Sequence, residues 1–159
     1  MNALIICHSG EEKNSLKVAQ VMADVLRAPL RQPFEVQPQQ LQSYDIIGFG
    51  AGIYFGKHHK TLLEFVDQLP VLGKRVFIFS TSGMGSTQPH RALRKKLAFR
   101  WCYVLGEFAC KAHDSFGIFK WFGGMNKGRT DGKDLERARH FALSLEEAAK
   151  KQPAQSPMK

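Results

Sequence analysis

Residues 44–57 read YDIIGFGAGIYFGK, and this stretch decides how the rest of the chain is interpreted. Residues 45–49 are mostly branched or aromatic and have no helical period, which predicts a buried strand. Glycines recur through the segment and let the backbone turn or approach a ligand closely, at Gly48, Gly50, Gly52 and Gly56. Tyr54 adds a flat amphipathic ring. The stretch predicts a strand that opens into a glycine-rich cradle for a planar, polar ligand.

The composition indicates one ordinary globular domain. The chain has 159 residues, of which 43% are hydrophobic and 23% charged. We expect a domain over residues 1–151 and a disordered tail over residues 152–159, which contain two prolines. No apolar run approaches the roughly 18 residues of a membrane span, and MNALIICHSGEE lacks the basic start of a signal peptide. We therefore expect a cytoplasmic protein.

The three cysteines, Cys7, Cys102 and Cys110, form no CxxC pair and have no metal-ligand spacing, so buried reduced thiols are expected and no metal site. Cys7 followed by Lys13 also invites comparison with a phosphatase loop, in which a cysteine thiolate attacks phosphate. Such a loop would need an arginine at position 13 and a later Asp-Pro acid, and the chain contains no Asp-Pro.

The formal net charge is +9, and it is unevenly distributed. Between Asp67 and Glu107 there is no acidic residue, but there are seven basic ones: Lys74, Arg75, Arg91, Arg94, Lys95, Lys96 and Arg100. Such a face could contact an acidic partner or an anionic membrane, or it could be a solvated helix face. Nucleic acid is a less favoured partner because no nucleic-acid-binding motif accompanies the charge.

Strand-like and helix-like segments alternate along the chain. The apolar patterns predict strands at residues 2–7, 34–37, 46–49, 75–80 and 103–110, and helices at residues 14–27, 61–68, 90–100 and 131–150. This alternation favours parallel βαβ units, and hence an α/β fold built as a three-layer αβα sandwich around a five-stranded parallel sheet. The loops after Cys7, Gly48 and Phe79 would meet at the carboxyl edge of that sheet, where ligands bind in such folds.

The first loop, HSGEEKNS, leads from a strand into a helix N-terminus, a natural phosphate site. Ser9, Asn14 and Ser15 could add side-chain donors. Glu11 and Glu12 would oppose a phosphate, although Lys13 partly offsets them. The alternative is a capped helix that holds no ligand.

The Ser…Asn-Ser loop, YDIIGFGAGIYFGK and FSTSGMG, each at a strand end, resemble the flavodoxin-like superfamily over roughly residues 2–148. The chain is most similar to short single-domain flavodoxin-family proteins. It also resembles the menaquinone-dependent protoporphyrinogen oxidases through residues 52–56, which a histidine and a Phe-Val helix follow. The resemblance implies a flavodoxin-like strand order, 2-1-3-4-5, and FMN as the cofactor.

The resemblance also implies roles for eleven residues. The FMN phosphate would be held by Ser9, Asn14 and Ser15. The isoalloxazine would be lined by Ala51, Gly52, Ile53 and Tyr54, with Tyr54 as the stacking ring. A second flavin loop would consist of Ser80, Thr81, Ser82 and Gly83. The chain departs from the family where Glu12-Lys13-Asn14-Ser15 replaces a small-residue Gly-Asn-Thr ending.

An FMN-dependent redox protein, either an electron carrier or a small oxidoreductase, is the leading hypothesis, with no catalytic acid or nucleophile from a side chain. A quinone or another hydrophobic partner would suit the aromatic-basic segment at residues 111–132. Because carrier flavodoxins are typically acidic, the positive charge favours an acidic partner protein, an anionic membrane or an acidic small-molecule substrate, as for a protoporphyrinogen-oxidase-type enzyme. His58 and His59 could contact such a substrate or simply be solvated. An aromatic-basic segment at residues 111–132 could meet a partner or pack under the last helix. The remaining alternative is an FMN-free binding module.

Overall fold

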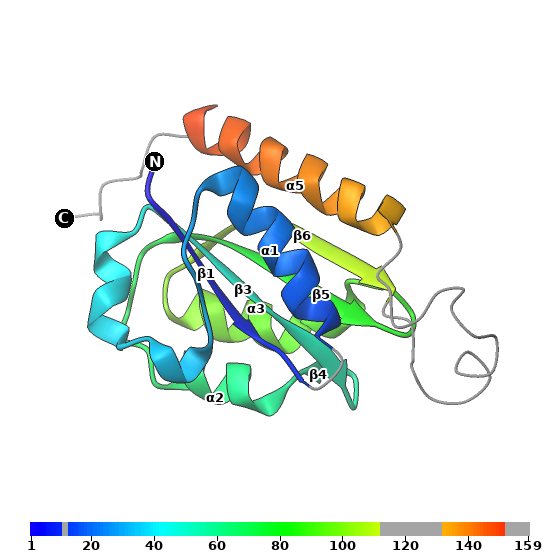
Figure 1. Ribbon diagram of the computed structural model, residues 1–159. Helices are drawn as coiled ribbons and strands as arrows, with labels where there is room; N and C mark the ends of the chain where they lie inside the picture. The colour runs from blue at the N-terminus through cyan, green and yellow to red at the C-terminus, as the bar shows by residue number, and fades with distance from the viewer. Residues whose placement is uncertain (11–12, 112–131, 152–159) are drawn as a thin grey trace.

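A computed structural model describes residues 1–10, 13–111 and 132–151 (Figure 1). Its centre is a sheet whose five parallel strands lie in the order β2-β1-β3-β5-β6, as predicted. The bounds of these strands are Ala3–His8 for β1, Leu30–Arg31 for β2, Ile46–Tyr54 for β3, Arg75–Ser82 for β5 and Tyr103–Lys111 for β6. A short strand, β4 (Lys57–His58), pairs antiparallel with the end of β3.

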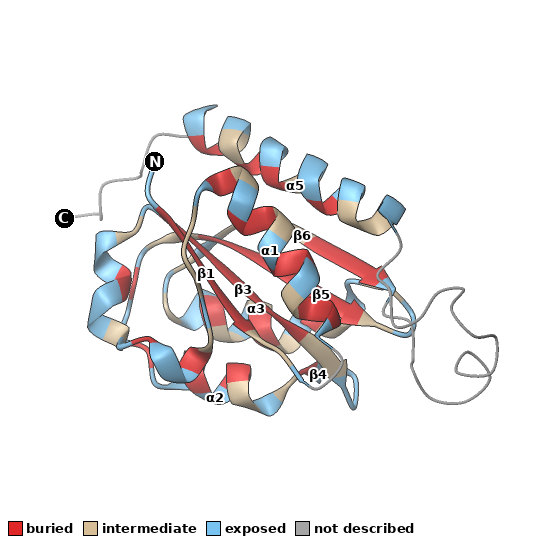
Figure 2. Ribbon diagram, viewed as in Figure 1, coloured by how far each residue is buried: buried red, intermediate tan, exposed pale blue. Residues whose placement is uncertain are grey.

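Helices cover both faces of the sheet and complete the three predicted layers (Figure 1). On one face α1 (Asn14–Leu26) and α5 (Gly132–Lys151) pack over the side chains of Ile5, Phe77 and Phe79. On the other face α2 (Lys60–Asp67) and α3 (Arg91–Phe99) pack over a second apolar core. The three central strands, β1, β3 and β5, are buried along most of their length, while the helices bury only an inner stripe (Figure 2).

Two glycines of β3 make room for aromatic rings on the neighbouring strand. A Cβ atom at Gly48 would lie 2.2 Å from the ring of Phe77, and one at Gly50 would lie 2.1 Å from the ring of Phe79. These glycines therefore serve the packing between the sheet and α1, because a side chain there would displace a buried ring.

The second strand does not lie where the sequence predicted it. Residues 34–37 are not a strand: Pro33–Glu35 form a 3-10 helix, η1, and a second such helix, η2, covers Pro38–Ser43. Proline fits the start of a helical turn because its φ is fixed and it has no N–H to donate. Leu30 and Arg31, only two residues, pair with β1 instead.

The third strand is longer than predicted and ends in a hairpin. β3 continues through the glycines as far as Tyr54, and Phe55 and Gly56 form the two-residue turn to β4, with φ of 53° and 78°. Both turn residues lie in the left-handed region that a tight hairpin requires. The predicted cradle is thus a strand and its hairpin rather than an irregular loop.

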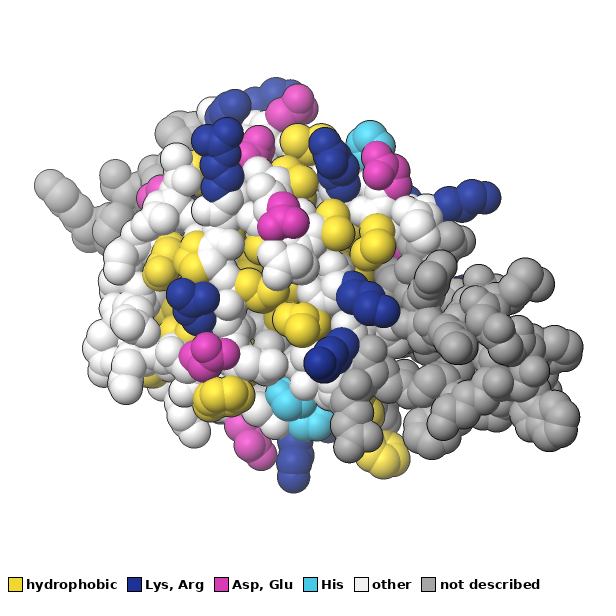
Figure 3. All heavy atoms as spheres, viewed as in Figure 1, with side chains coloured by type: hydrophobic (Ala, Val, Ile, Leu, Met, Phe, Trp, Pro, Cys, Tyr) yellow, Lys and Arg dark blue, Asp and Glu magenta, His cyan; other side chains and the backbone are white. Residues whose placement is uncertain are grey.

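Three predictions fall wholly or partly outside the described residues: Glu11 and Glu12, the aromatic segment and the tail at residues 152–159. Within the described ranges, no helix combines the length and apolar character that crossing a membrane requires. On the face covered by α1 and α5, lysine and arginine side chains are interspersed with acidic ones rather than gathered (Figure 3).

Candidate functional site

The carboxyl ends of β1, β3 and β5 lie side by side at one edge of the sheet. His8 is in register with Ala51, Ala51 with Ser80, and Gly52 with Thr81. The chain order of the strands reverses between β1 and β3, and open α/β sheets bind ligands at such a point. All three predicted loops therefore start from neighbouring positions.

The first loop enters α1 through a left-handed residue. Lys13, at the N-cap position, has φ 55° and makes no side-chain capping hydrogen bond. The first turn of α1 contains no acidic residue, so no carboxylate of this turn offsets the partial positive charge of its free N–H groups. The Asn14 side chain is buried, and its Oδ1 has no hydrogen-bond partner in the part of the chain that the structure describes. Ser9 is half-buried, and its Oγ donates to the Gly10 carbonyl.

A hydrogen bond between two buried hydroxyls joins the first loop to the end of β5. Ser15 Oγ lies 2.7 Å from Thr81 Oγ1, although the residues are 66 positions apart in the chain. The bond ties α1 directly to the third loop, so two of the predicted site residues are brought together.

Tyr54 lies over the glycines of the first two loops. A Cβ atom at Gly10 would lie 3.2 Å from its hydroxyl, and one at Gly52 would lie 3.2 Å from its ring. The ring is 49% exposed and meets the His59 ring edge-on, with centroids 5.0 Å apart. Of the other residues predicted for this wall, Ala51 is buried and Ile53 half-buried. Tyr54 thus offers a partly open aromatic face at the strand edge.

The predicted second flavin loop divides between the two faces of the sheet. Ser80 is fully buried on the α2–α3 face, where its Oγ lies 2.6 Å from His90 Nε2. Thr81 turns to the α1 face and meets Ser15. At the last residue of the strand, Ser82 Oγ accepts a hydrogen bond from the Gly85 N–H at 2.9 Å, while Gly83 is exposed. The side chain of Ser80 is therefore engaged inside the protein.

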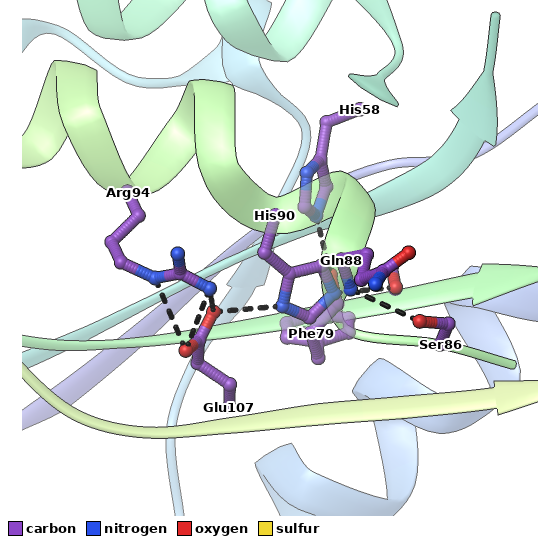
Figure 4. A network of polar contacts seen from close by, with 8 residues as sticks. His58, Phe79, Ser86, Gln88, His90, Arg94 and Glu107 are labelled. Carbon is purple, nitrogen blue, oxygen red and sulfur yellow. Dashed lines mark hydrogen bonds and ion pairs between the residues drawn. The ribbon is translucent and has the colours of Figure 1, made fainter. Parts of the chain in front are cut away.

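A polar network lies beneath this strand end (Figure 4). His90 Nδ1 lies 3.0 Å from Glu107 Oε1, and the Arg94 guanidinium donates to both oxygens of that carboxylate at 2.9 and 3.0 Å. His58 Nε2 lies 3.0 Å from the Phe79 carbonyl oxygen, and its ring centroid is 4.9 Å from that of His90. The network spans β4, β5, α3, β6 and η3 (Gln88–His90).

The hydrogen bonds assign a tautomer to each buried imidazole. A carbonyl oxygen only accepts, so His58 carries its proton on Nε2; a carboxylate only accepts, so His90 carries its proton on Nδ1 and accepts from the Ser80 hydroxyl. Burial lowers the pKa of His58 to about 4, assisted by the neighbouring His90. Burial also lowers the pKa of His90, against the opposing effect of Glu107. Both rings are neutral at pH 7.

The two adjacent histidines of the hairpin have different environments. His58 is only 1% exposed, so it is neither solvated nor able to touch a substrate from outside. His59 caps α2 by accepting the Thr61 N–H on Nδ1, and its ring stacks on His8 with centroids 4.0 Å apart. Burial, then His59, lowers the pKa of His8. Of the two hairpin histidines, only His59 lies at the carboxyl edge of the sheet, where its ring contacts His8.

The cysteines are unsuited to nucleophilic chemistry. Burial raises the pKa of the Cys7 thiol to about 12, so it is not a thiolate at neutral pH and the phosphatase comparison fails. The described residues contain no cluster of three or more histidine, cysteine or acidic side chains that could hold a metal ion.

Most of the predicted basic stretch has partners within the protein. Arg94 binds Glu107, Lys96 lies 2.7 Å from Asp67, and Arg100 donates to the Asp67 carbonyl. Two further members also donate to backbone carbonyls: Lys74 to Gln42 and Arg75 to Ala149. Five of the seven basic side chains thus bind groups within the protein, two of them carboxylates and three of them backbone carbonyls.

Comparison with known proteins agrees with this architecture. The sequence model of the flavodoxin domain matches residues 5–112, so the chain belongs to the flavodoxin domain family. An uncharacterized protein of Methanocaldococcus jannaschii is 44% identical over 147 residues, which cover 91% of this chain and 98% of that protein. The family indicates a flavin-binding electron-transfer protein.

Solved structures share the fold at low sequence identity. The oxidised flavodoxin 2 of Bacillus cereus superposes with a TM-score of 0.66 at 17% identity, covering 92% of this chain and 99% of that one. Rubredoxin oxygen:oxidoreductase of Desulfovibrio gigas matches with a TM-score of 0.65 at 15% identity, covering 95% of this chain and 37% of that one. The flavodoxin-like fold is thereby shown.

Sequence reasoning missed the polar network. The sequence predicts the helix that carries His90 and Arg94 and the strand that carries Glu107, but not the contacts that join them. One signal was available: Glu107 is the only acidic residue in the apolar run at residues 103–110, and a charge in a strand usually has a partner.

Proposed function

We propose that the protein binds FMN at this edge of the sheet and acts as a redox protein. The observation that carries the proposal is the hydrogen bond between Ser15 and Thr81. It joins the helix end that would hold the phosphate to the strand end that would border the flavin ring, so both parts of one site are held in a fixed relation.

The first loop fits a phosphate group. Among the described residues no side chain caps the N-terminus of α1, and its first turn contains no acidic residue, so its N–H groups are available to an anion. Asn14 is buried there with an unpartnered oxygen, and a half-turn of the amide would present its N–H₂ group instead. Lys13 takes a left-handed conformation, which glycine adopts readily, in the segment where the resemblance places a glycine.

The second loop fits a flat ring. Tyr54 offers a half-exposed aromatic face, and Gly10 and Gly52 lie directly against it without side chains. Ala51, Gly52 and Ile53 would form the wall, and the backbone of residues 80–83 would border the polar edge. Ser9, Asn14 and Ser15 would surround the phosphate, although the Ser15 hydroxyl already bonds Thr81.

Bound flavin supplies the one- and two-electron chemistry, and the protein binds it, orients it and excludes water. Tyr54 would cover one face of the ring. The α1 N-terminus would neutralise the phosphate, and the buried apolar strands beneath would keep water from the site. We assign no side chain the role of nucleophile.

The physiological partner follows from charge. A net charge of +9 favours an acidic redox protein or an acidic small molecule, and a cytoplasmic location is proposed on the composition alone. Contact with an anionic membrane is less favoured, because most basic side chains of residues 74–100 bind groups within the protein.

The absorption spectrum of the purified protein tests this function. A yellow protein with flavin absorption, or FMN uptake at micromolar concentration by the colourless protein, is expected. A colourless protein that takes up no FMN would favour an FMN-free binding module. Rapid-mixing reduction of the loaded protein by NAD(P)H, menaquinol or reduced ferredoxin then separates a carrier from an oxidoreductase.

A further inference from the structure

The polar network of His58, His90, Glu107 and Arg94 contains no residue that is proposed to contact FMN. His58 and His90 are 1% and 0% exposed. Burying two imidazoles costs free energy that apolar side chains would not require. The hydrogen bonds of the network show which part of the backbone it holds in place, namely the end of β5.

The hydrogen bond between Ser80 and His90 closes a loop. The two residues are ten positions apart, and the residues between them include Thr81, Ser82 and Gly83 of the proposed second flavin loop. Within this segment the Gln88 N–H donates to Ser86 Oγ at 3.1 Å, as Figure 4 shows. The base of the loop is thus fixed by one buried side-chain contact.

His58 fixes the same strand from the hairpin. Its Nε2–H donates to the carbonyl of Phe79, the residue before Ser80, while its own strand pairs with β3 at Ile53. The imidazole therefore connects the hairpin that carries Tyr54 to the strand that carries Thr81.

The arrangement around Ser80 also has the order of a serine–histidine–carboxylate triad, with distances of 2.6 and 3.0 Å. Ser80 is 0% exposed, so no substrate carbonyl can reach its hydroxyl. The contacts of this group lead instead to the backbone of β5 and to the hairpin.

We propose that His58 and His90 are positioning residues of the flavin site, which fix the end of β5 and the β3–β4 hairpin relative to each other. The proposal rests on the proposed function for its effect on FMN, but its effect on the backbone stands independently. Glu107 holds the His90 tautomer that accepts from Ser80, and Arg94 holds Glu107. These two are the charged groups that the described structure brings to the pair, from β6 and α3.

Two substitutions at His58 separate positioning from simple packing. His58→Gln keeps an N–H donor for the Phe79 carbonyl, whereas His58→Phe keeps a flat ring and loses the donor. His140→Phe, on the exposed side of α5, is the matched control. Ser80→Ala removes a single hydroxyl and opens the loop from its other end, and it replaces His58→Phe if that variant does not fold.

Two measurements at pH 7 decide the proposal. FMN affinity, from quenching of flavin fluorescence, should fall at least tenfold in His58→Phe and stay within threefold of the parent in His58→Gln and His140→Phe. Amide exchange of the FMN-free protein should show at least tenfold lower protection for residues 80–85 in His58→Phe, with α1 and α5 unchanged. A separate check of the two tautomers is nitrogen NMR, whose shifts should report Nε2–H for His58 and Nδ1–H for His90.

Equal protection of residues 80–85 in His58→Phe and His58→Gln overturns the proposal, as does a loss spread evenly over the molecule. If the parent protein takes up no FMN, the proposed function fails, and the exchange comparison alone decides whether the two histidines position β5.

Discussion

The two faces of β5 are held by different chemistry at the carboxyl end. On the α1 side, Phe79 packs against Gly50 and Thr81 bonds Ser15 through hydroxyls, so no charge is involved. On the α2–α3 side, Ser80 joins a network of two histidines and an ion pair. Successive residues of one strand thus enter an apolar layer and a titratable layer.

The carboxyl end of β5 is therefore fixed from both faces of the sheet, by a different kind of interaction on each. The apolar side depends on shape, because a ring fills the space that glycine leaves. The polar side depends on protonation, because each buried imidazole is held as one neutral tautomer. Both ring nitrogens of His90 make hydrogen bonds, whereas His58 bonds through Nε2 and its Nδ1 is buried without a partner among the described residues. Substitutions and pH should therefore affect the two sides separately.

Acid should act through the polar side and produce the largest change. His58 has a pKa of about 4 in the folded protein and an ordinary value of 6.5, so below pH 6.5 the unfolded state binds more protons. The free energy of unfolding should fall by about 3 kcal/mol between pH 6.5 and pH 4 from His58 alone. Urea unfolding across this range measures it.

His58→Gln is the control for this prediction. It should flatten the profile between pH 6.5 and pH 4, leaving the smaller contribution of His90, whose pKa is also lowered. An equally steep profile in this variant would assign the acid sensitivity to other groups.

Gly50→Ala should disturb the apolar side at any pH. The added Cβ would meet the Phe79 ring at 2.1 Å, so a buried ring must move, at a cost of about 2 kcal/mol in the free energy of unfolding. Gly83→Ala is the matched control, because no atom of the described residues lies within 4 Å of its added Cβ. Equal stability of the two variants would refute the packing role of Gly50.

Tyr54→Ala tests the proposed contact between the protein and the flavin ring. The ring contributes a half-exposed aromatic face, so its loss should weaken FMN binding about tenfold, or roughly 1.4 kcal/mol. Fluorescence titration of FMN measures the change, with Phe55→Ala at the fully exposed tip of the hairpin as the comparison. An unchanged affinity would remove Tyr54 from the site.

Lys13→Gly should have the smallest effect and the opposite sign. Lys13 is held at φ 55°, a conformation that costs a side-chain-bearing residue free energy and costs glycine little. The variant should be about 0.5–1 kcal/mol more stable to urea without FMN. A loss of stability would mean that the lysine side chain stabilises the loop.

The fold could be predicted largely because its strands are apolar and its helices amphipathic. The order of the five parallel strands followed from that alternation and the resemblance, and the comparison confirms it. The second strand could not be placed because Leu30 and Arg31 are too few to show a pattern, whereas the alternation at residues 34–37 imitates a strand.

The site could be predicted only at the level of its loops. The meeting of Ser15 and Thr81 follows from strand order, since both lie at the same sheet edge. The burial of His58 could not be predicted, because KHHK reads as a polar loop and only the hairpin turns alternate residues inward. His90 was equally hidden, since its partner Glu107 is 17 positions away on another strand.

The most direct test of the flavin site is a nitrogen–proton NMR titration of the labelled protein with FMN, followed residue by residue. The predicted result is saturable shift changes at residues 8–15, 51–55 and 80–85, with little change at residues 99–103 on the opposite edge of the sheet. An absence of saturable changes, or changes centred outside those three loops, would contradict the proposed site.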